Sequence, residues 1–331
     1  MTVAVEDLYA EHHRFLWGLC YRMLGSAADA EDIVQDTFVR AMERPPRRAD
    51  EPVRPWLVRV ALNLSRDFLR RRRRREYIGP WLPSPIDTGD ESAPPSHEPA
   101  IDGVPIADSS VREARKAVGD RSPYLARRPV PEYDLLESVS FAFLLALEAL
   151  TPTQRGVLLL RDVFDYSVKE TADALDLSEA NVKTTHHRAR HAMQVYDGRR
   201  QIPTADVQDA ARTALNEFLR CLTQHDVGGI EALLAEDVRT VTDGGGEFQA
   251  ALRPVVGRDR VARFYLAVIE TARDAVVRMQ MLNGTPAIVA DLPSPTGRQA
   301  PRFTFAVDLN GEGKIADIYV VSATRKLTAI K

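Results

Sequence analysis

The sequence contains two cysteines among 331 residues, and its charges nearly cancel to a net −3. Cys20 and Cys221 lie far apart, each within an apolar helical pattern, which predicts buried thiols in a reducing compartment and argues against a disulfide framework. No apolar run approaches the ~18 residues that a membrane helix needs. No basic segment followed by an apolar stretch marks the N-terminus as a secretion signal. We therefore expect a cytoplasmic protein without membrane contact.

Metal-ligand spacing is also missing. The HExxH pattern is absent, and His186 and His187 are adjacent, so on a helix they point about 100° apart and cannot share one ion. His187 and His191 are spaced to share one, but no third ligand joins them. We expect no metal and no cofactor, and we expect His186 to be a hydrogen-bonded histidine of a packed face.

Changes of composition divide the chain into four parts. Residues 1–77 have helical periodicity, residues 78–132 are rich in Pro, Gly, Ser and acids and predict a linker, and residues 133–199 are helical again. Between residues 204 and 331, one long amphipathic helix and a second, shorter one precede alternating apolar runs. The turn sequences DGGG, NGTP and NGEG separate these runs. The last part is therefore predicted to be an α+β domain.

The third part contains two helices joined by a short turn. Ser167 and Glu170 have the spacing of a capping box, so a helix is predicted to begin at residue 168. Ser178 is predicted to cap the second helix. The apolar stripe of that helix comprises Val182, His186, Ala189 and Met193. Because basic residues lie outside the stripe, the pair predicts a helix-turn-helix that binds the major groove, with a merely solvated charged helix as the alternative.

The first part contains an acidic helix and a basic helix. In residues 29–41, acidic side chains lie outside the apolar stripe, which suits either a basic partner or solvent. In residues 56–70, one face repeats Arg59, Asn63, Arg66 and Arg70. Nine arginines in residues 52–77 stand against two acidic residues. This concentration of positive charge predicts binding to phosphates.

Three segments carry a resemblance to a known family. DAEDIVQDTF, PWLVRVALNLSRDFLRR and LTPTQRGVLLLRDVFDYSVKETADALDLSEANVKTTHHRAR resemble regions 2 and 4 of bacterial sigma factors of the extracytoplasmic-function type. YIGPWLPSP, VTDGGGE and NGTPA are similar to the subgroup that adds a C-terminal SnoaL-like domain. Two positions depart from the pattern: Asp176 replaces the usual helix-turn-helix glycine, and ATRKL replaces a motif that usually reads Asn-Pro-Asp-Lys-Leu.

The resemblance implies a multidomain fold. Two all-α sigma domains, region 2 at residues 1–77 and the region 4 helix-turn-helix domain at residues 133–199, are joined by the linker at residues 78–132. An α+β SnoaL-like cone domain follows at residues 204–331.

The resemblance also implies an alternative sigma factor that binds core RNA polymerase and initiates transcription. Its partners would be the polymerase β′ clamp helices and β flap, and promoter DNA. For polymerase binding, the resemblance implies Asp29, Glu31, Asp32, Gln35 and Phe38. For the minus-ten promoter element, it implies Arg54, Arg59, Asn63, Arg66 and Arg70. For the minus-thirty-five element, it implies Glu179, Asn181, Lys183, Thr184, His187 and Arg188.

The C-terminal domain is expected to regulate the sigma domains in cis and not to act as an enzyme. Some SnoaL-like relatives are cyclases or isomerases, but His225, Asp226 and Asp243 are not spaced for general acid/base work. Trp81 in a polar linker is costly to leave in water, which predicts a docking pocket in this domain. The residues expected at that contact are Trp81, Leu82, Pro83, Asp243, Gly244 and Gly245. A ligand-responsive helix-turn-helix regulator, with a SnoaL-like sensor or catalytic domain for an unknown small ligand, is the alternative function.

Overall fold

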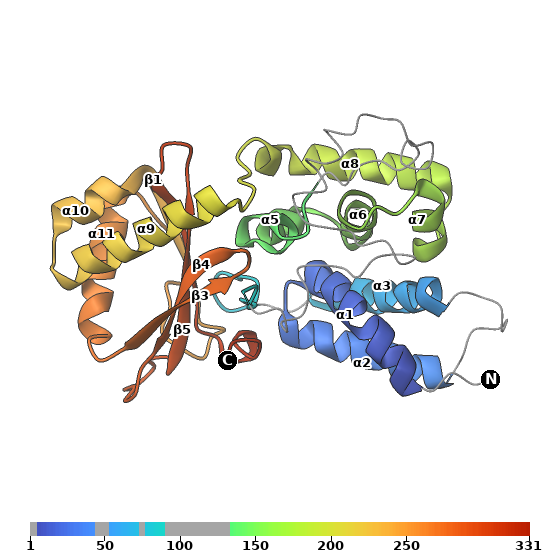
Figure 1. Ribbon diagram of the computed structural model, residues 1–331, viewed down its shortest axis with the longest axis horizontal. Helices are drawn as coiled ribbons and strands as arrows, with labels where there is room; N and C mark the ends of the chain where they lie inside the picture. The colour runs from blue at the N-terminus through green and yellow to red at the C-terminus, as the bar shows by residue number, and fades with distance from the viewer. Residues whose placement is uncertain (1–4, 44–52, 73–76, 90–132) are drawn as a thin grey trace.

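The computed structural model describes residues 5–43, 53–72, 77–89 and 133–331, so most of the expected linker lies outside the described residues. Figure 1 shows an N-terminal helical domain, a helix-turn-helix domain beside it, and a C-terminal α+β domain at the other end of the molecule. Among the described helices, none is long and apolar enough to cross a membrane.

The N-terminal domain is built from α1 (Val5–Leu24), α2 (Ala27–Glu43) and α3 (Val53–Arg72). The Ser26 Oγ accepts the backbone N–H of Asp29 at 3.3 Å, at the start of α2. The apolar stripes of the three helices share one core, and burial there raises the pKa of the Cys20 thiol to about 12. The predicted buried thiol is thus confirmed, and the charged faces of α2 and α3 lie opposite this core.

The helix-turn-helix domain contains α5 (Phe141–Ala146), α6 (Pro152–Leu158), α7 (Val168–Leu175) and α8 (Glu179–Asp197), with short 3-10 turns at Glu137–Val139 and Leu147–Ala149 and a π-turn at Leu159–Val163. The capping box of Ser167 and Glu170 is confirmed, and Ser178 caps α8. Between the two helices Asp176 has a φ of 54°, the left-handed conformation that the turn requires and that aspartate tolerates. The helix-turn-helix predicted from the sequence is therefore confirmed.

The C-terminal domain contains α9 (Ala205–Thr223), α10 (Val227–Leu233), β1 (Leu234–Asp243), β2 (Val255–Val256), α11 (Arg258–Thr271), β3 (Val276–Leu282), β4 (Thr285–Asp291), β5 (Arg302–Leu309), β6 (Ile315–Val321) and a 3-10 turn, η5 (Thr324–Lys326). The strand order is β2-β1-β6-β5-β4-β3, and only the β1–β6 pair is parallel. The predicted α+β fold is confirmed. Helix α11 was not expected from the sequence, although its buried residues Val261, Ala262 and Tyr265 have the spacing of one helical face.

The two faces of this sheet pack against different partners. Helices α9, α10 and α11 cover one face, where the rings of Phe218 and Phe305 both pack against Tyr265, with centroids 5.6 and 5.3 Å away. The other face meets the rest of the molecule and shares a buried cluster with Leu82 and Phe141. The face of the sheet that the helices do not cover is therefore an interdomain interface.

Candidate nucleic-acid and polymerase interfaces

The outer side of α2 presents a small acidic surface. Asp32 and Gln35 are exposed, while Asp29 and Glu31 are partly buried. The Gln35 amide donates to Glu31 at 3.2 Å, which keeps both side chains on that side of the helix. Phe38 is a correction: it is only 4% exposed and packs in the core of the N-terminal domain, so it cannot lie on this surface. We call Asp29, Glu31, Asp32 and Gln35 the acidic face of α2.

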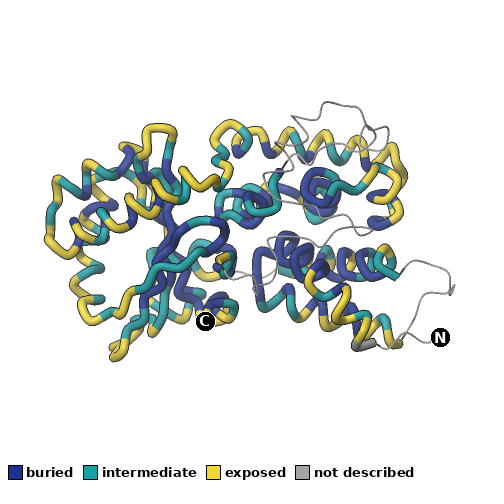
Figure 2. The backbone as a smooth tube through the Cα atoms, in the orientation of Figure 1, coloured by how far each residue is buried: buried dark blue, intermediate teal, exposed yellow. Residues whose placement is uncertain are grey.

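The outer side of α8 is open to solvent. All its candidate DNA-binding residues are exposed: Glu179, Asn181, Lys183, Thr184, His187 and Arg188. Figure 2 shows exposed residues along the outer edge of this helix. On the packed side, the ring of His186 lies 2.7 Å from the carboxylate of Asp162, which confirms the predicted hydrogen-bonded histidine. The basic outer side is therefore free to enter a DNA groove.

The basic side of α3 is partly covered. Asn63 and Arg70 are exposed, but Arg66 is partly buried beneath the helix-turn-helix domain. Its guanidinium donates to the Leu175 carbonyl at 3.3 Å and to the Thr153 hydroxyl at 3.2 Å. A DNA strand that reaches Arg66 must displace these two contacts.

The two other α3 candidates are partly buried. The Arg54 guanidinium lies 4.1 Å from the centroid of the Phe15 ring, a cation–π contact that holds it against α1. Arg59 is partly buried. Of the five α3 candidates, only Asn63 and Arg70 are exposed, and Arg70 pairs with Asp67 at 3.1 Å.

A carboxylate holds the N-terminal domain to the helix-turn-helix domain. Both oxygens of Glu148 lie 2.8 Å from Arg72 of α3, and one of them lies 3.0 Å from Arg155. Arg155 is buried and also donates to the Met23 carbonyl at 2.7 Å. Burial acts to raise the pKa of Glu148, but the two guanidiniums outweigh it and lower the pKa. No local spacing in the sequence predicts this contact, because its members are far apart along the chain.

The described part of the linker is bound by the C-terminal domain. Leu82 is fully buried, and its backbone N–H donates to Asp243 at 2.8 Å. Asp243 also accepts from the Tyr77 hydroxyl at 2.7 Å and from the Lys326 ammonium, which donates in turn to the Leu82 carbonyl. Burial lowers the pKa of Lys326 to about 8, although the charge of Asp243 opposes this. Each oxygen of the buried carboxylate thus has a partner, which is the condition for a stable buried pair.

Trp81 lies on the other side of the same linker segment, against the N-terminal domain. Its ring is 4.5 Å from the Arg72 guanidinium and 4.6 Å from the Lys326 ammonium. Gly25, between α1 and α2, has a φ of 65°, and a Cβ there would lie 2.5 Å from the indole. Trp81 therefore contacts both the N-terminal and the C-terminal domain, whereas its expected contact was with the C-terminal domain alone.

The remaining residues expected at this contact lie around the same carboxylate. Pro83 is buried beside Leu82, and Gly244 and Gly245 form the turn after β1. The Gly245 backbone N–H donates to Asp243 at 3.0 Å. The DGGG sequence therefore shapes the turn that presents the carboxylate to the linker.

A second polar contact joins all three domains. Asn283, fully buried in the β3–β4 turn, donates from its amide to the Tyr21 hydroxyl at 2.8 Å and to the Val139 carbonyl at 2.7 Å. Its side-chain oxygen accepts the backbone N–H of Ile86 at 2.9 Å. The asparagine of the NGTP turn was predicted only as a turn former, with a φ that is indeed positive at 52°. Its hydrogen bonds between the domains were not predicted.

Comparison with known proteins identifies the two helical domains. The family described as Sigma-70 region 2 matches residues 8–75, and the family described as Sigma-70, region 4 matches residues 140–193. The chain is 38% identical over 124 residues to the ECF RNA polymerase sigma factor SigL of Mycobacterium tuberculosis, which covers 36% of this chain and 69% of SigL. The chain belongs to the extracytoplasmic-function sigma factors.

A similarity over the full length includes the third domain. The chain is 29% identical over 336 residues to the ECF RNA polymerase sigma factor SigJ of Mycobacterium tuberculosis, covering 99% of this chain and 94% of SigJ. A crystal structure of SigJ superimposes with a TM-score of 0.66 at 25% identity, over 98% of this chain and 99% of that chain. The protein is thus an alternative sigma factor that acts in transcription initiation, with a SnoaL-like C-terminal domain.

The acid/base candidates of this sigma factor are engaged elsewhere. His225 lies on the surface, 2.6 Å from Glu270, and Asp243 is occupied by the linker. Among the residues that the structure describes, no three His, Cys, Asp or Glu side chains are grouped to hold a metal ion. The relatives named above are ECF RNA polymerase sigma factors.

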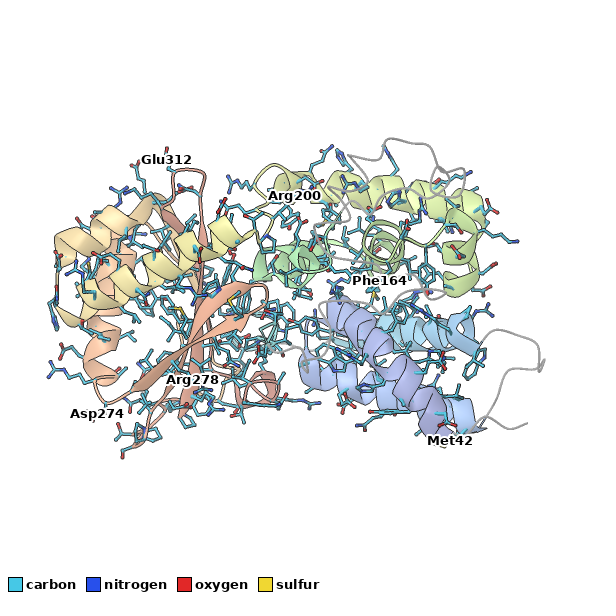
Figure 3. All side chains as sticks on the ribbon, in the orientation of Figure 1. Met42, Phe164, Arg200, Asp274, Arg278 and Glu312 are labelled. Atoms are coloured by element: carbon cyan, nitrogen blue, oxygen red, sulfur yellow. The ribbon has the colours of Figure 1, made fainter. Side chains whose placement is uncertain are left out.

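A cleft lies between the helix-turn-helix domain and the sheet. It has a volume of about 890 Å³ and is lined by the end of α8, the start of α9 and the ends of β5 and β6. Figure 3 labels Arg200, which lines the cleft where the chain passes from α8 to α9. On its floor the Tyr319 hydroxyl donates to Asp308 at 3.0 Å. Burial, together with the charge of Asp317, raises the pKa of Asp308 to about 6.

Proposed function

We propose that the C-terminal domain of this sigma factor holds the two sigma domains in a closed arrangement that limits promoter binding. The acidic face of α2 would bind the β′ clamp helices, the basic side of α3 the minus-ten element, and the outer side of α8 the minus-thirty-five element. In the closed arrangement the outer side of α8 is accessible, whereas the basic side of α3 is partly covered at Arg66. The C-terminal domain would act by contact and not by chemistry.

The observation that carries this proposal is the position of Arg66. Its guanidinium, a candidate for the minus-ten strand, is bonded to Leu175 and Thr153 of the helix-turn-helix domain. Binding of an unstacked promoter strand relies on a basic groove along the backbone and on stacking surfaces. With the helix-turn-helix domain in place, this groove is interrupted at Arg66.

The linker supports the proposal by fixing the closed arrangement. Full burial of Leu82 in the C-terminal domain stabilises the docked linker by about 2 kcal/mol. Docking shortens the tether between the two DNA-binding domains and so biases their separation. The C-terminal domain can shift this equilibrium only by the difference between its contacts in the closed and polymerase-bound forms.

A reconstituted transcription assay with core RNA polymerase tests the proposal. Full-length protein should support initiation that core enzyme alone does not. Trp81→Ala, which removes the indole between Arg72 and Lys326, should increase transcript yield at limiting promoter and increase protease cleavage within residues 86–132. Val227→Ala is the control, because Val227 is an exposed apolar residue of α10, on the face of the sheet that the linker does not contact.

Two other outcomes would redirect the interpretation. Tight promoter binding without polymerase, with repression in place of initiation, would favour the ligand-responsive regulator. A Trp81→Ala protein that transcribes and resists protease like the parent would show that the docked linker does not control activity, and a ligand-binding or catalytic role for the SnoaL-like domain would be reopened.

A further inference from the structure

The C-terminal domain reaches the acidic face of α2 with one side chain. Arg325, in the turn η5 that follows β6, lies 3.2 Å from a carboxylate oxygen of Asp29 and 3.1 Å from one of Asp32. Figure 1 shows η5, next to the C-terminal end of the chain, against the start of α2. The resemblance to sigma factors departs at these residues, since ATRKL has Arg325 where the usual Asn-Pro-Asp-Lys-Leu motif has Asp. An arginine here places a positive charge directly on the acidic face.

The segment that carries Arg325 is held firmly in this position. Lys326 is buried on Asp243, and the next residue, Leu327, packs into the interdomain apolar cluster. Arg278 of β3, labelled in Figure 3, donates to the Lys331 carbonyl at 2.5 Å. Arg325 itself is 68% exposed and Asp32 64% exposed. The contact is thus a solvent-accessible ion pair on an ordered backbone, so the ordering that opposes it is mainly that of the two side chains.

We propose that Arg325 competes with RNA polymerase for Asp29 and Asp32 of α2. This inference rests on the proposed role of the acidic face in binding the β′ clamp helices. One carboxylate pair cannot serve a basic surface of the polymerase while it pairs with Arg325. Docking of the C-terminal domain and docking of polymerase on α2 therefore oppose each other, and each weakens the other by the same factor.

The exposure of the ion pair between Arg325 and the acidic face sets how strongly it can compete with polymerase. Ion pairs between exposed side chains are weak, so loss of Arg325 should strengthen polymerase binding by about two- to fivefold. Because exposed charges are screened by salt, the gain should shrink as ionic strength rises. The competition tunes polymerase affinity and does not abolish it.

The test is a titration of labelled full-length protein with core RNA polymerase at low and at high ionic strength. Arg325→Ala should bind about two- to fivefold more tightly than the parent at low ionic strength, with a smaller difference at high ionic strength. Arg273→Ala is a matched control, because Arg273 is 67% exposed on the same domain and pairs only locally, with Glu270 three residues earlier. It should bind like the parent.

Asp32→Ala separates this inference from the proposed function on which it rests. If Asp32→Ala weakens binding while Arg325→Ala leaves it unchanged, the acidic face binds polymerase but the competition does not exist. If neither change alters binding, both the docking surface and the competition are rejected. Weaker binding by Arg325→Ala would mean that Arg325 itself contacts polymerase, which also overturns the proposal.

Discussion

The helices α3 and α8 both carry basic residues outside an apolar stripe, but these residues differ in their exposure. The candidate side chains of α8 all point to solvent. On α3, Arg66 is bonded to the helix-turn-helix domain and Arg54 lies on Phe15. The periodicity of a helix therefore identifies a polar face but does not tell whether water, DNA or another domain covers it.

The largest expected effect comes from breaking the contact that keeps α3 covered. Glu148→Gln removes the charge that pairs with Arg72 and Arg155 and leaves a buried guanidinium without its carboxylate. Because the Glu148 side chain is 35% exposed, the loss should be smaller than for a fully buried pair, about 2 kcal/mol. The unfolding free energy measured in urea should fall by this amount, and small-angle scattering should show a larger radius of gyration.

Glu217→Gln is the control for that substitution. Glu217 also pairs with an arginine, Arg220 at 2.6 Å, but on the exposed side of α9. It should leave both measurements close to those of the parent. An equal loss in the two proteins would mean that Glu148 has no special role between the domains.

A matched pair of substitutions sharpens the comparison between the helices. Arg188→Ala on α8 should weaken promoter binding by about 1–3 kcal/mol if Arg188 contacts a base, with relaxed preference at one position, and should leave stability unchanged. If Arg188 contacts only a phosphate, promoter binding should weaken equally for all sequences, and the affinity should depend less steeply on salt. The same two outcomes are expected for Lys183→Ala. Arg66→Ala on α3 should weaken promoter binding and also lower the unfolding free energy. Identical behaviour of Arg66→Ala and Arg188→Ala in unfolding experiments would contradict the covered state of α3.

A smaller effect concerns the far end of α8, which borders the cleft over Asp308. Burial raises the folded-state pKa of Asp308 from 3.8 to about 6, so the folded protein binds more protons than the unfolded chain between these pH values. The free energy of unfolding therefore decreases as pH rises through this window and stays lower at neutral pH. Asp308→Asn keeps an acceptor for Tyr319 and removes this penalty.

The Asn variant should thus be more stable than the parent by about 1–2 kcal/mol at pH 7.5, with the difference vanishing near pH 4. Thermal unfolding at both pH values measures this. A variant that is less stable at pH 7.5 would show that the ionised carboxylate is needed in the cleft.

Local features of this fold could be predicted from the sequence, and contacts between domains could not. The caps at Ser167 and Ser178 and the left-handed Asp176 follow from preferences that act within a few residues. Helical periodicity also identified the acidic face of α2. Phe38 was assigned to that face by the family resemblance alone, and it lies in the apolar stripe that packs in the core. Arg325 and Glu148 meet partners hundreds or tens of residues away, and no periodicity encodes such pairs.

The burial of polar side chains at domain junctions could not be predicted from the sequence either. Lys326 was expected only as part of a divergent motif, yet it is buried on Asp243. A lone lysine in a sequence predicts a solvated charge. Only the fold, which brings β1, the linker and η5 together, turns it into an interior ion pair.

The side-chain amide of Asn283 links the separation of one domain to that of the others. It is bonded at once to Tyr21 of the N-terminal domain, Ile86 of the linker and Val139 of the helix-turn-helix domain. Withdrawal of any one neighbour leaves a buried polar group unsatisfied, which costs about 1–3 kcal/mol and removes much of the reason for the others to stay. Partly opened forms are therefore penalised relative to both extremes. We therefore expect the domains to separate together, because the loss of one of these contacts weakens the others.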